Sequence, residues 1–296
     1  MKNTIVTIGM FDGVHLGHRH ILQHLLSQSQ QQGLEPVVLT FSRHPRQMLS
    51  KEPFGLLNTF EERMALLRDA GVGNIKVVDF TFDLASQSAC EFYDGFIVPE
   101  LHPSAMVFGY DNTFGNRQHN DFSLLRERLE AEEVALYDAD SVLVEGEAVS
   151  STRIRKALEM GDITLANRLL GYHYSLSGEV CHGRGIGHTL GFATANVSLE
   201  ASEKQIPLDG VYAVAVSLEG KTYRGVANLG PQPTIAGTSR VFEVHLIGYD
   251  QELYGSTLRV DFLGRIRDIR RFESCEALAA QIAEDVRLSL NLEDTI

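Results

Sequence analysis

The 296-residue chain has few cysteines and no long apolar run. Its three cysteines, Cys90, Cys181 and Cys275, lie far apart and form no C-x-x-C pair. That spacing provides neither a zinc site nor a disulfide framework, and it fits a reducing compartment. No run of 18 apolar residues occurs, and the first residues lead directly into a predicted strand without a signal peptide. We therefore expect a cytoplasmic protein that does not act at a membrane.

Positive charge is also scarce. Lysine and arginine number 26 against 39 acidic residues, which gives a net charge of −13. Proteins that bind nucleic acid in general need a basic face, so we expect no nucleic-acid partner. At this length one hydrophobic core is unusual, and two domains are predicted. Nothing in the sequence indicates an obligate protein partner.

Two histidines stand where a strand leads into a helix near the N-terminus. The β-branched run 4–8 predicts a buried strand, and the apolar spacing in 19–32 predicts a helix. His15 and His18, three residues apart at the start of that helix, can face the same way and donate hydrogen bonds to a phosphoryl group. The alternative is two unrelated surface histidines in a chain that has eleven. The strand, the Phe-Asp-Gly sequence and the helix favour a nucleotide site. Its expected ATP-binding residues are Gly9, Phe11, Asp12 and Gly13.

The first half of the chain alternates strands with helices. This alternation predicts a doubly wound parallel sheet. After the first strand, the predicted strands are 36–41, 74–80, 105–108 and 134–138.

A second phosphate-binding segment is predicted at 149–155. Ser151 and Thr152 are good N-caps for the helix that follows, which is their ordinary structural role. Arginines in a first helical turn, such as Arg155, oppose the helix dipole. They are better explained if phosphate oxygens supply the compensating charge, so Ser151, Thr152 and Arg155 are expected to bind ATP.

Beyond two short connector helices, the apolar period changes to two. This change predicts a small antiparallel β-barrel, followed by a helix that Ser274 caps. The predicted strands are 174–181, 210–218, 221–229, 240–247 and 257–262.

A glycine-rich stretch opens this second half. Dense glycines expose successive N–H groups to a phosphate chain, although flexible hairpin glycines would explain the pattern equally well. Thr194 and Asn196, two residues apart on an extended chain, point the same way and offer neutral oxygen ligands suited to Mg²⁺. The candidate ATP-binding residues here are Gly178, Gly183, Gly185, Gly187, Gly191, Thr194 and Asn196.

Strand 240–247 carries a candidate catalytic carboxylate. Phe242, Val244 and Leu246 alternate toward the barrel core, so Glu243 and His245 share the opposite face. A carboxylate on such a face is usually only solvated. The nearby glycine-rich stretch and Thr-Ala-Asn sequence favour a functional role.

The motifs of the first half resemble those of the bacterial bifunctional riboflavin kinase/FMN adenylyltransferase (FAD synthetase) family. The resemblance rests on Gly-x-Phe-Asp-Gly-Val-His-x-Gly-His, Thr40-Phe41 with His44-Pro45, Gly109-x-Asp111 with Phe114-Gly115, and Ser-Ser-Thr-Arg-Ile-Arg. It implies an FMN adenylyltransferase domain over 1–170, connector helices included. His15 and His18 would be catalytic on ATP phosphates, and Asp111 and Phe114 would lie near the flavin.

The second half is similar to the riboflavin kinase module of the same family. The similarity rests on the Gly-rich L-G-F-x-T-A-N pattern, Gly210-Val211-Tyr212, Asn228-Leu229-Gly230, Glu243-Val244-His245 and Leu253-Tyr254-Gly255. It implies a kinase domain over 171–296, with Thr194 and Asn196 holding Mg²⁺ and ATP and Glu243 as catalytic base. Arg270 would border the flavin. The expected ligands are riboflavin, FMN, FAD and ATP, with Mg²⁺ as cofactor.

Three positions depart from the kinase pattern. Ala193 replaces a proline, His188 stands where arginine is common, and Ile269 replaces an expected glutamate. Two alternatives therefore stay open. One is a monofunctional FAD synthetase whose barrel only binds flavin, and the other is a non-enzymatic flavin or nucleotide sensor.

Overall fold

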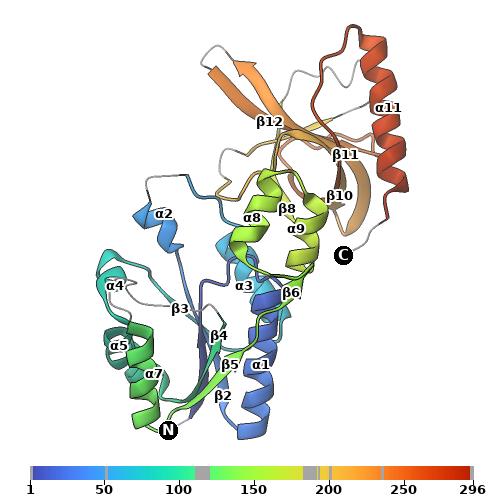
Figure 1. Cartoon of the computed structure of the whole chain (residues 1–296). Coiled ribbons are helices and arrows are strands. Elements are labelled where there is room, and N and C mark those ends of the chain that lie inside the picture. Colours follow the sequence, from blue (N-terminus) through green and yellow to red (C-terminus); the bar gives the residue numbers. More distant parts are fainter. Residues whose placement is uncertain are drawn as a thin grey trace. The chain divides into compact units, whose positions relative to one another are not determined.

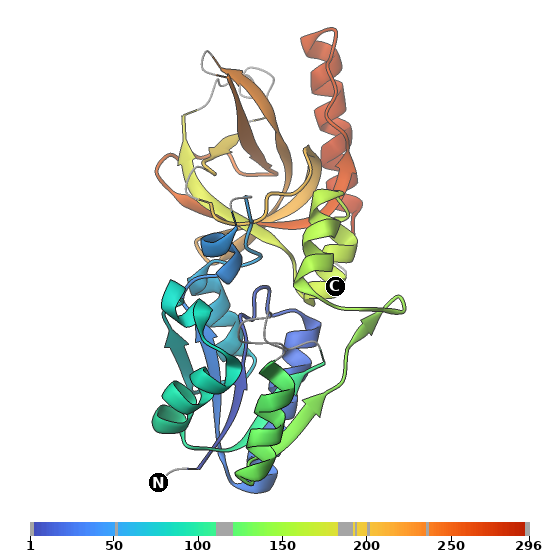
Figure 2. The ribbon, with the colours of Figure 1, turned by 60° about the vertical axis from the view of Figure 1, so that its left-hand side comes forward.

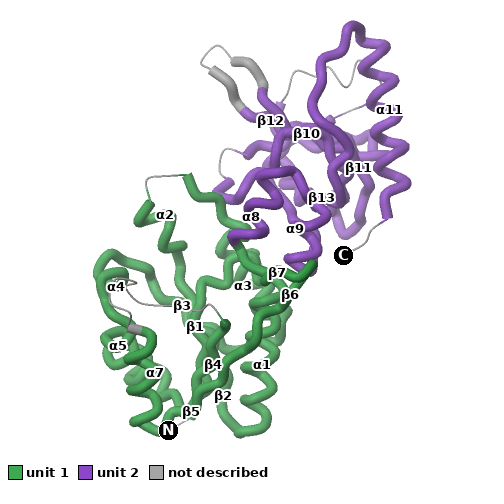
Figure 3. Tube along the Cα trace, viewed as in Figure 1, with its two compact units in different colours: residues 1–151 green, residues 152–296 purple. Residues whose placement is uncertain are grey.

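The computed structural model describes residues 3–50, 53–110, 121–182, 192, 194–199, 202–234 and 237–293. The chain divides into two compact units, residues 1–151 and 152–296 (Figure 3). Within the described residues, no helix is both long and apolar enough to cross a bilayer.

The first unit is built on a five-stranded parallel sheet (Figure 1). Its strand order is β3-β2-β1-β4-β5, so the chain starts at the centre and moves to one edge before crossing to the other. This confirms the parallel sheet predicted from the sequence. The strands are β1 (Thr4–Ile8), β2 (Glu35–Phe41), β3 (Ile75–Val78), β4 (Pro103–Gly109) and β5 (Ala135–Ala139).

Helices cover both faces of this sheet. Successive residues of β1 point to opposite faces, so Ile5 packs with α1 (Leu16–Gln32) and α3 (Phe60–Asp69), whereas Val6 packs with the helices of the other face. That face is covered by α5 (Ala89–Phe92), a π-helical turn (Tyr93–Ile97), α6 (Val98–Leu101) and α7 (Asp121–Ala131). The remaining elements are α2 (Pro45–Leu49), α4 (Phe82–Ser86) and the hairpin β6 (Leu143–Val144) and β7 (Glu147–Ala148).

The second unit is a closed antiparallel barrel (Figure 2). Its order around the barrel is β10-β11-β12-β9-β8-β13, which confirms the predicted barrel. Phe242, Tyr212 and Phe262 are buried inside it with their rings in contact. The strands are β8 (Ser175–Cys181), β9 (Ala195–Val197), β10 (Gly210–Leu218), β11 (Lys221–Thr234), β12 (Gly237–Leu246) and β13 (Thr257–Arg267).

In the described part of the second unit, three helices accompany the barrel. The C-terminal helix α11 (Cys275–Asn291) begins at the predicted cap, where the Ser274 side chain accepts a hydrogen bond from the N–H of Ala277, and it packs against β10, β11 and β13. The connector helices are α8 (Ser151–Glu159) and α9 (Ile163–Leu170). Asn167 of α9 donates to the carbonyl of Phe262 and accepts from the N–H of Tyr174, so α9 is fastened to the barrel. A domain boundary at residue 170 stays a prediction.

Candidate functional site

The turn between β1 and α1 has an unusual backbone. Phe11 has φ +50°, Gly13 +92° and Val14 +33°. A positive φ is easy for glycine and costly for a β-branched residue such as valine. Backbone strain of this kind persists only where the surroundings hold it, and it gathers at functional sites.

Asp12 anchors this turn. Its Oδ1 accepts hydrogen bonds from the N–H groups of Leu57 (3.0 Å) and Asn58 (3.3 Å). Its carbonyl accepts a hydrogen bond of 2.8 Å from Oγ of Ser151. Asp12 is 2% exposed, so the contacts observed for this carboxylate are those of a structural anchor. Ser151, the first residue of α8, is thereby joined to the histidine turn.

The two predicted histidines lie together. His15 caps α1, and its Nδ1 accepts a hydrogen bond of 3.3 Å from the N–H of His18. The two rings stack with centroids 3.6 Å apart, and the edge of Phe11 meets His18 at 5.3 Å. Because Nδ1 of His15 is an acceptor, a neutral His15 carries its proton on Nε2 and presents a donor there.

His18 has an electrostatic environment that favours its neutral form. Burial lowers its pKa well below the usual value, and the neighbouring His15 and Arg63 lower it further. Its Nδ1 is buried and has no hydrogen-bond partner among the residues that the structure describes. A buried polar atom without a partner is uncommon and is a natural contact for a ligand.

The other residues predicted for this site have different placements. Gly9 approaches the Phe11 ring closely, since a Cβ on it would lie 3.2 Å from that ring. Thr152 and Arg155 lie on α8 beyond Ser151, in the second unit; Thr152 is exposed and Arg155 is buried. Asp111 and Phe114 lie outside the described residues.

A row of polar side chains crosses the barrel. In the antiparallel pairings, Glu243 of β12 lies directly opposite Asn196 of β9 on one side and Asn228 of β11 on the other. The row continues through Val211 of β10 to Arg267 of β13. Side chains directly opposite one another leave the same face of a sheet. Because Phe242 and Val244 fill the barrel interior, this row lies on the outer face.

A cavity of about 320 Å³ lies over this row. Glu243 and His245 both line it, which confirms that they share a face. Predicted Thr194 and Arg270 line it as well. Its opposite wall comes from α11 and the segment before that helix. The remaining lining residues are Val211, Val226, Asn228, Arg267, Ile269, Phe272, Leu278, Ile282 and Asp285.

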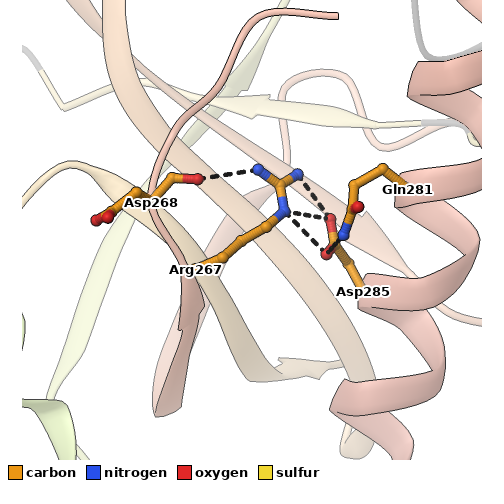
Figure 4. Close-up of polar contacts among 4 residues, drawn as sticks. All are labelled: Arg267, Asp268, Gln281 and Asp285. Carbon is orange, nitrogen blue, oxygen red and sulfur yellow. Dashed lines mark hydrogen bonds and ion pairs between the residues drawn. The ribbon is translucent and has the colours of Figure 1, made fainter.

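Two of the residues that line this cavity, Arg267 and Asp285, form an ion pair (Figure 4). The Arg267 guanidinium donates to both carboxylate oxygens of Asp285, with Nη2 2.8 Å from Oδ2 and Nε 3.0 Å from Oδ1. The side-chain amide of Gln281 donates to the same carboxylate at 2.7 Å, and Nη1 of Arg267 donates to the Asp268 carbonyl at 3.0 Å. A bidentate pair of this kind fixes direction as well as distance, so it ties α11 to the end of β13.

Gly178 has a structural explanation. A Cβ on Gly178 would lie 2.0 Å from the carbonyl oxygen of Ser198, so β8 and the chain after β9 approach too closely for any side chain. An ATP-binding role for Gly178 stays a prediction. Gly183, Gly185, Gly187 and Gly191 lie outside the described residues, as do Ala193 and His188.

Sequence reasoning missed three members of the second site. Asn228, Arg267 and Asp285 were not among its candidates. Leu278 and Ile282, expected only as core packing of the last helix, also line the cavity. Asn228 could have been found from the sequence, because side chains alternate along β11 and those of Val226 and Asn228 therefore leave the same face.

Two families match the chain. The family described as FAD synthetase matches residues 1–153, and the family described as riboflavin kinase matches residues 170–292. Several curated relatives have the name bifunctional riboflavin kinase/FMN adenylyltransferase. The protein from Haemophilus influenzae is 36% identical over 97% of this chain and 93% of its own length. That from Bacillus subtilis is 34% identical over 95% and 90%.

One solved structure covers both units. A crystal structure described as a macrolide-efflux protein from Streptococcus pneumoniae matches with a TM-score of 0.90 and 31% identity. The match covers 99% of this chain and 95% of that one. The efflux description concerns the Streptococcus protein, and no observation on the present chain favours such a role.

Proposed function

The chain belongs to the bifunctional riboflavin kinase/FMN adenylyltransferase family, and from that premise we propose how its residues divide the two reactions. The kinase reaction moves the γ-phosphoryl group of ATP to riboflavin and yields FMN. The adenylyltransferase reaction joins the AMP part of a second ATP to FMN, giving FAD and pyrophosphate. The proposal is supported above all by the presence, in separate units, of a carboxylate facing a cavity and a stacked histidine pair.

Glu243 is the base of the kinase reaction. The nucleophile is an alcohol, the 5′-hydroxyl of riboflavin, which attacks poorly while it keeps its proton. Glu243 accepts that proton as the oxygen forms its bond to the γ-phosphorus and ADP leaves. A positioned base contributes about 10²–10⁴-fold to such a reaction. Asn196 and Asn228, directly opposite Glu243 on either side, hold polar groups next to the carboxylate.

Thr194 and Asn196 fit a hard cation. Thr194 lines the cavity and Asn196 lies opposite Glu243, so a hydroxyl and an amide oxygen stand near the carboxylate. Such oxygen donors suit Mg²⁺, which keeps much of its water and takes few protein ligands. When bound with ATP, Mg²⁺ supplies positive charge to the phosphates.

The adenylyltransferase reaction makes different demands. The nucleophile is the phosphate of FMN, already an anion, so no base is needed when it attacks the α-phosphorus. The obstacle is repulsion between phosphates, which hydrogen-bond donors and positive charge reduce. His15, which in its neutral form carries its proton on Nε2, is proposed as a donor in this role, and His18 lies stacked upon it. Ser151, whose hydroxyl donates to the carbonyl of Asp12, is proposed to bind ATP phosphate, and so are Thr152 and Arg155 of α8.

Three further residues are proposed to contact the flavin. Arg270 is proposed to contact the flavin in the kinase cavity, which it lines. Asp111 and Phe114 are proposed to contact the flavin of the adenylyltransferase. An adenylyltransferase domain over residues 1–170 and a kinase domain over residues 171–296 are likewise proposed. A cytoplasmic location is proposed because cysteines are few and far apart.

Reciprocal variants test the division of labour. We expect Glu243→Gln to lose FMN formation while FAD formation from supplied FMN continues. His18→Ala should do the reverse and stall the pathway at FMN. In each variant the surviving activity shows that the chain is present and that the other unit is folded, and circular dichroism checks the unit that carries the substitution. Equal loss of both activities in either variant would contradict the assignment.

A time course with riboflavin, ATP and Mg²⁺ separates this proposal from the two alternatives. We expect FMN first and FAD after it. A monofunctional FAD synthetase would form no FMN under these conditions. A non-enzymatic sensor would form neither product from any combination of substrates.

A further inference from the structure

A buried arginine lies behind the histidine turn of the first unit. Arg63, on α3, is 4% exposed. Its Nη1 donates to the carbonyl of Met10 at 3.0 Å, and its Nη2 donates to the carbonyl of Phe41 at 2.5 Å. Met10 follows β1 and Phe41 ends β2, so one guanidinium joins the ends of two neighbouring strands. The carboxyl edge of a parallel sheet, where these residues lie, is where such folds bind ligands.

The charge of Arg63 has no ion-pair partner among the described residues. The carboxylate of Asp12 attracts the Arg63 charge, but its Oδ1 already accepts hydrogen bonds from the N–H groups of Leu57 and Asn58. Nε of Arg63 is buried and has no hydrogen-bond partner in the described part of the chain. Burial lowers the pKa of Arg63, and Asp12 offsets this only in part. A buried cation whose charge is compensated only in part destabilises a fold unless a ligand supplies further negative charge.

We propose that Arg63 is a positioning residue of the adenylyltransferase reaction. It holds the 9–15 turn against the end of β2 through the carbonyls of Met10 and Phe41. It also places next to His18 a positive charge, which the negative charge of the nucleotide phosphates compensates. The proposal rests on the function proposed above for the histidine turn. Arg63 acts through the turn and through His18, because its donors already point to the two backbone carbonyls.

The surroundings of His18 agree with this role. The charged or titratable groups that act on His18 are His15 from the turn and Arg63 from α3, and the edge of Phe11 meets its ring. Both groups and burial lower the pKa of His18, so the free enzyme holds it neutral at pH 7. Arriving phosphates add negative charge beside it, so its pKa rises and it takes up a proton. The imidazolium then stabilises the charge that builds on the phosphates.

The test compares Arg63→Met with Arg68→Met, a matched change on the exposed side of the same helix. Arg63→Met removes both the charge and the hydrogen bonds to the carbonyls. Arg63→Lys keeps a cation but loses the planar fork that reaches two carbonyls at once. In each variant of the full chain, FAD formation from FMN and FMN formation from riboflavin are measured separately. Histidine NMR follows the titration of His18, whose signal is assigned by its absence from His18→Ala.

We expect Arg63→Met to lower kcat/KM for FAD formation about 100-fold, the scale for misplacing a reacting group, with FMN formation unchanged. Its His18 titration midpoint should rise toward the ordinary histidine value, because a repelling charge has gone. In the parent and in Arg68→Met, that midpoint should be low without ATP and should rise when saturating Mg²⁺ and ATP are added. Arg63→Lys should recover part of the lost FAD formation.

The proposal is overturned if Arg63→Met equals Arg68→Met in FAD formation or in the His18 midpoint. If Arg63→Met does not fold, Arg63→Lys decides, and FAD formation equal to that of Arg68→Met overturns the proposal. These outcomes differ from a failure of the proposed function. In that case His18→Ala itself would keep forming FAD, whatever Arg63 does.

Discussion

Asn196 and Glu243 lie directly opposite each other on neighbouring antiparallel strands of the barrel. The pair places a neutral amide and a carboxylate on one face, next to a cavity that Glu243 lines. On the other side of Glu243, at the same level, lies Asn228. Two asparagines thus flank one carboxylate, and only one of them follows the Thr-Ala sequence proposed to hold Mg²⁺. The two can be separated by experiment.

We expect Asn196→Ala to raise the Mg²⁺ concentration needed for half-maximal FMN formation by about tenfold or more, because the proposed metal ligand is removed. Asn228→Ala is the matched control and should keep the Mg²⁺ requirement of the parent. The measurement is the rate of FMN formation against Mg²⁺ at saturating ATP and riboflavin. An equal shift in both variants would show that the asparagines act alike and that Asn196 has no special relation to the metal.

The ion pair between Arg267 and Asp285 makes a prediction on stability. The Asp285 side chain is 2% exposed and that of Arg267 is 18% exposed. Neutralising Asp285 therefore leaves the largely buried charge of Arg267 without its counter-charge. We expect Asp285→Asn to lower the free energy of unfolding of the second unit by about 3 kcal/mol, as for other broken buried pairs. The KM for riboflavin should rise, since α11 forms a wall of the cavity.

The neighbouring Glu284→Gln is the control for this change. Its pair with Arg287 is exposed, with side chains 45% and 61% accessible. Exposed pairs contribute about 0–1 kcal/mol. Calorimetry of both variants and riboflavin titrations of the kinase rate measure the difference. If Asp285→Asn has the same melting temperature and the same KM for riboflavin as Glu284→Gln, the buried pair does not hold α11 in place as a wall of the cavity.

The parts that sequence predicted well depend on local pattern. The alternation of Phe242, Val244 and Leu246 placed Glu243 and His245 on one outward face, and the cavity confirms it. The strand, turn and helix around His15 follow in the same way from residues within 30 positions of one another. In both cases the period of the apolar residues decides which side chains point together.

The parts it missed depend on register and on helix packing. Asn228 reaches the site because β11 pairs with β12 in one register, and a shift of one residue would turn it away. Asp285 meets Arg267 across 18 positions, through a helix whose docking no local pattern specifies. The strand β9, only three residues long, is too short to show a period. Arg63 looks in sequence like any charged residue of a surface helix, yet it is buried.

Gly178 tests whether a glycine of the kinase unit serves packing or ATP. Since a Cβ would lie 2.0 Å from the Ser198 carbonyl oxygen, we expect Gly178→Ala to lower the melting temperature of the second unit by several degrees. Gly95→Ala lies in the first unit, where a Cβ would meet nothing within 4 Å, and it should leave the melting of its own unit unchanged or raise it. An unchanged melting temperature with a raised KM for ATP would instead favour the phosphate role for Gly178.

The lowered pKa of His18 predicts how the stability of the first unit depends on pH. In the unfolded chain the histidine titrates near its usual value of about 6.5, and in the folded chain it titrates lower. Between those two values the unfolded state holds more protons, so the free energy of unfolding falls as the pH is lowered through this window. Above about pH 7 both states are neutral at this position, and His18 contributes no pH dependence.

One proton of this kind gives a slope of at most about 1.4 kcal/mol per pH unit. We expect His18→Gln to remove that slope, whereas His20→Gln, on the same helix, should keep it. Urea unfolding between pH 5 and 8, followed through NMR signals of β1 and β4, measures it. The difference in slope is the decisive quantity, because either variant can shift the absolute stability through lost packing. If the two variants have the same slope, His18 is not the group that burial holds neutral.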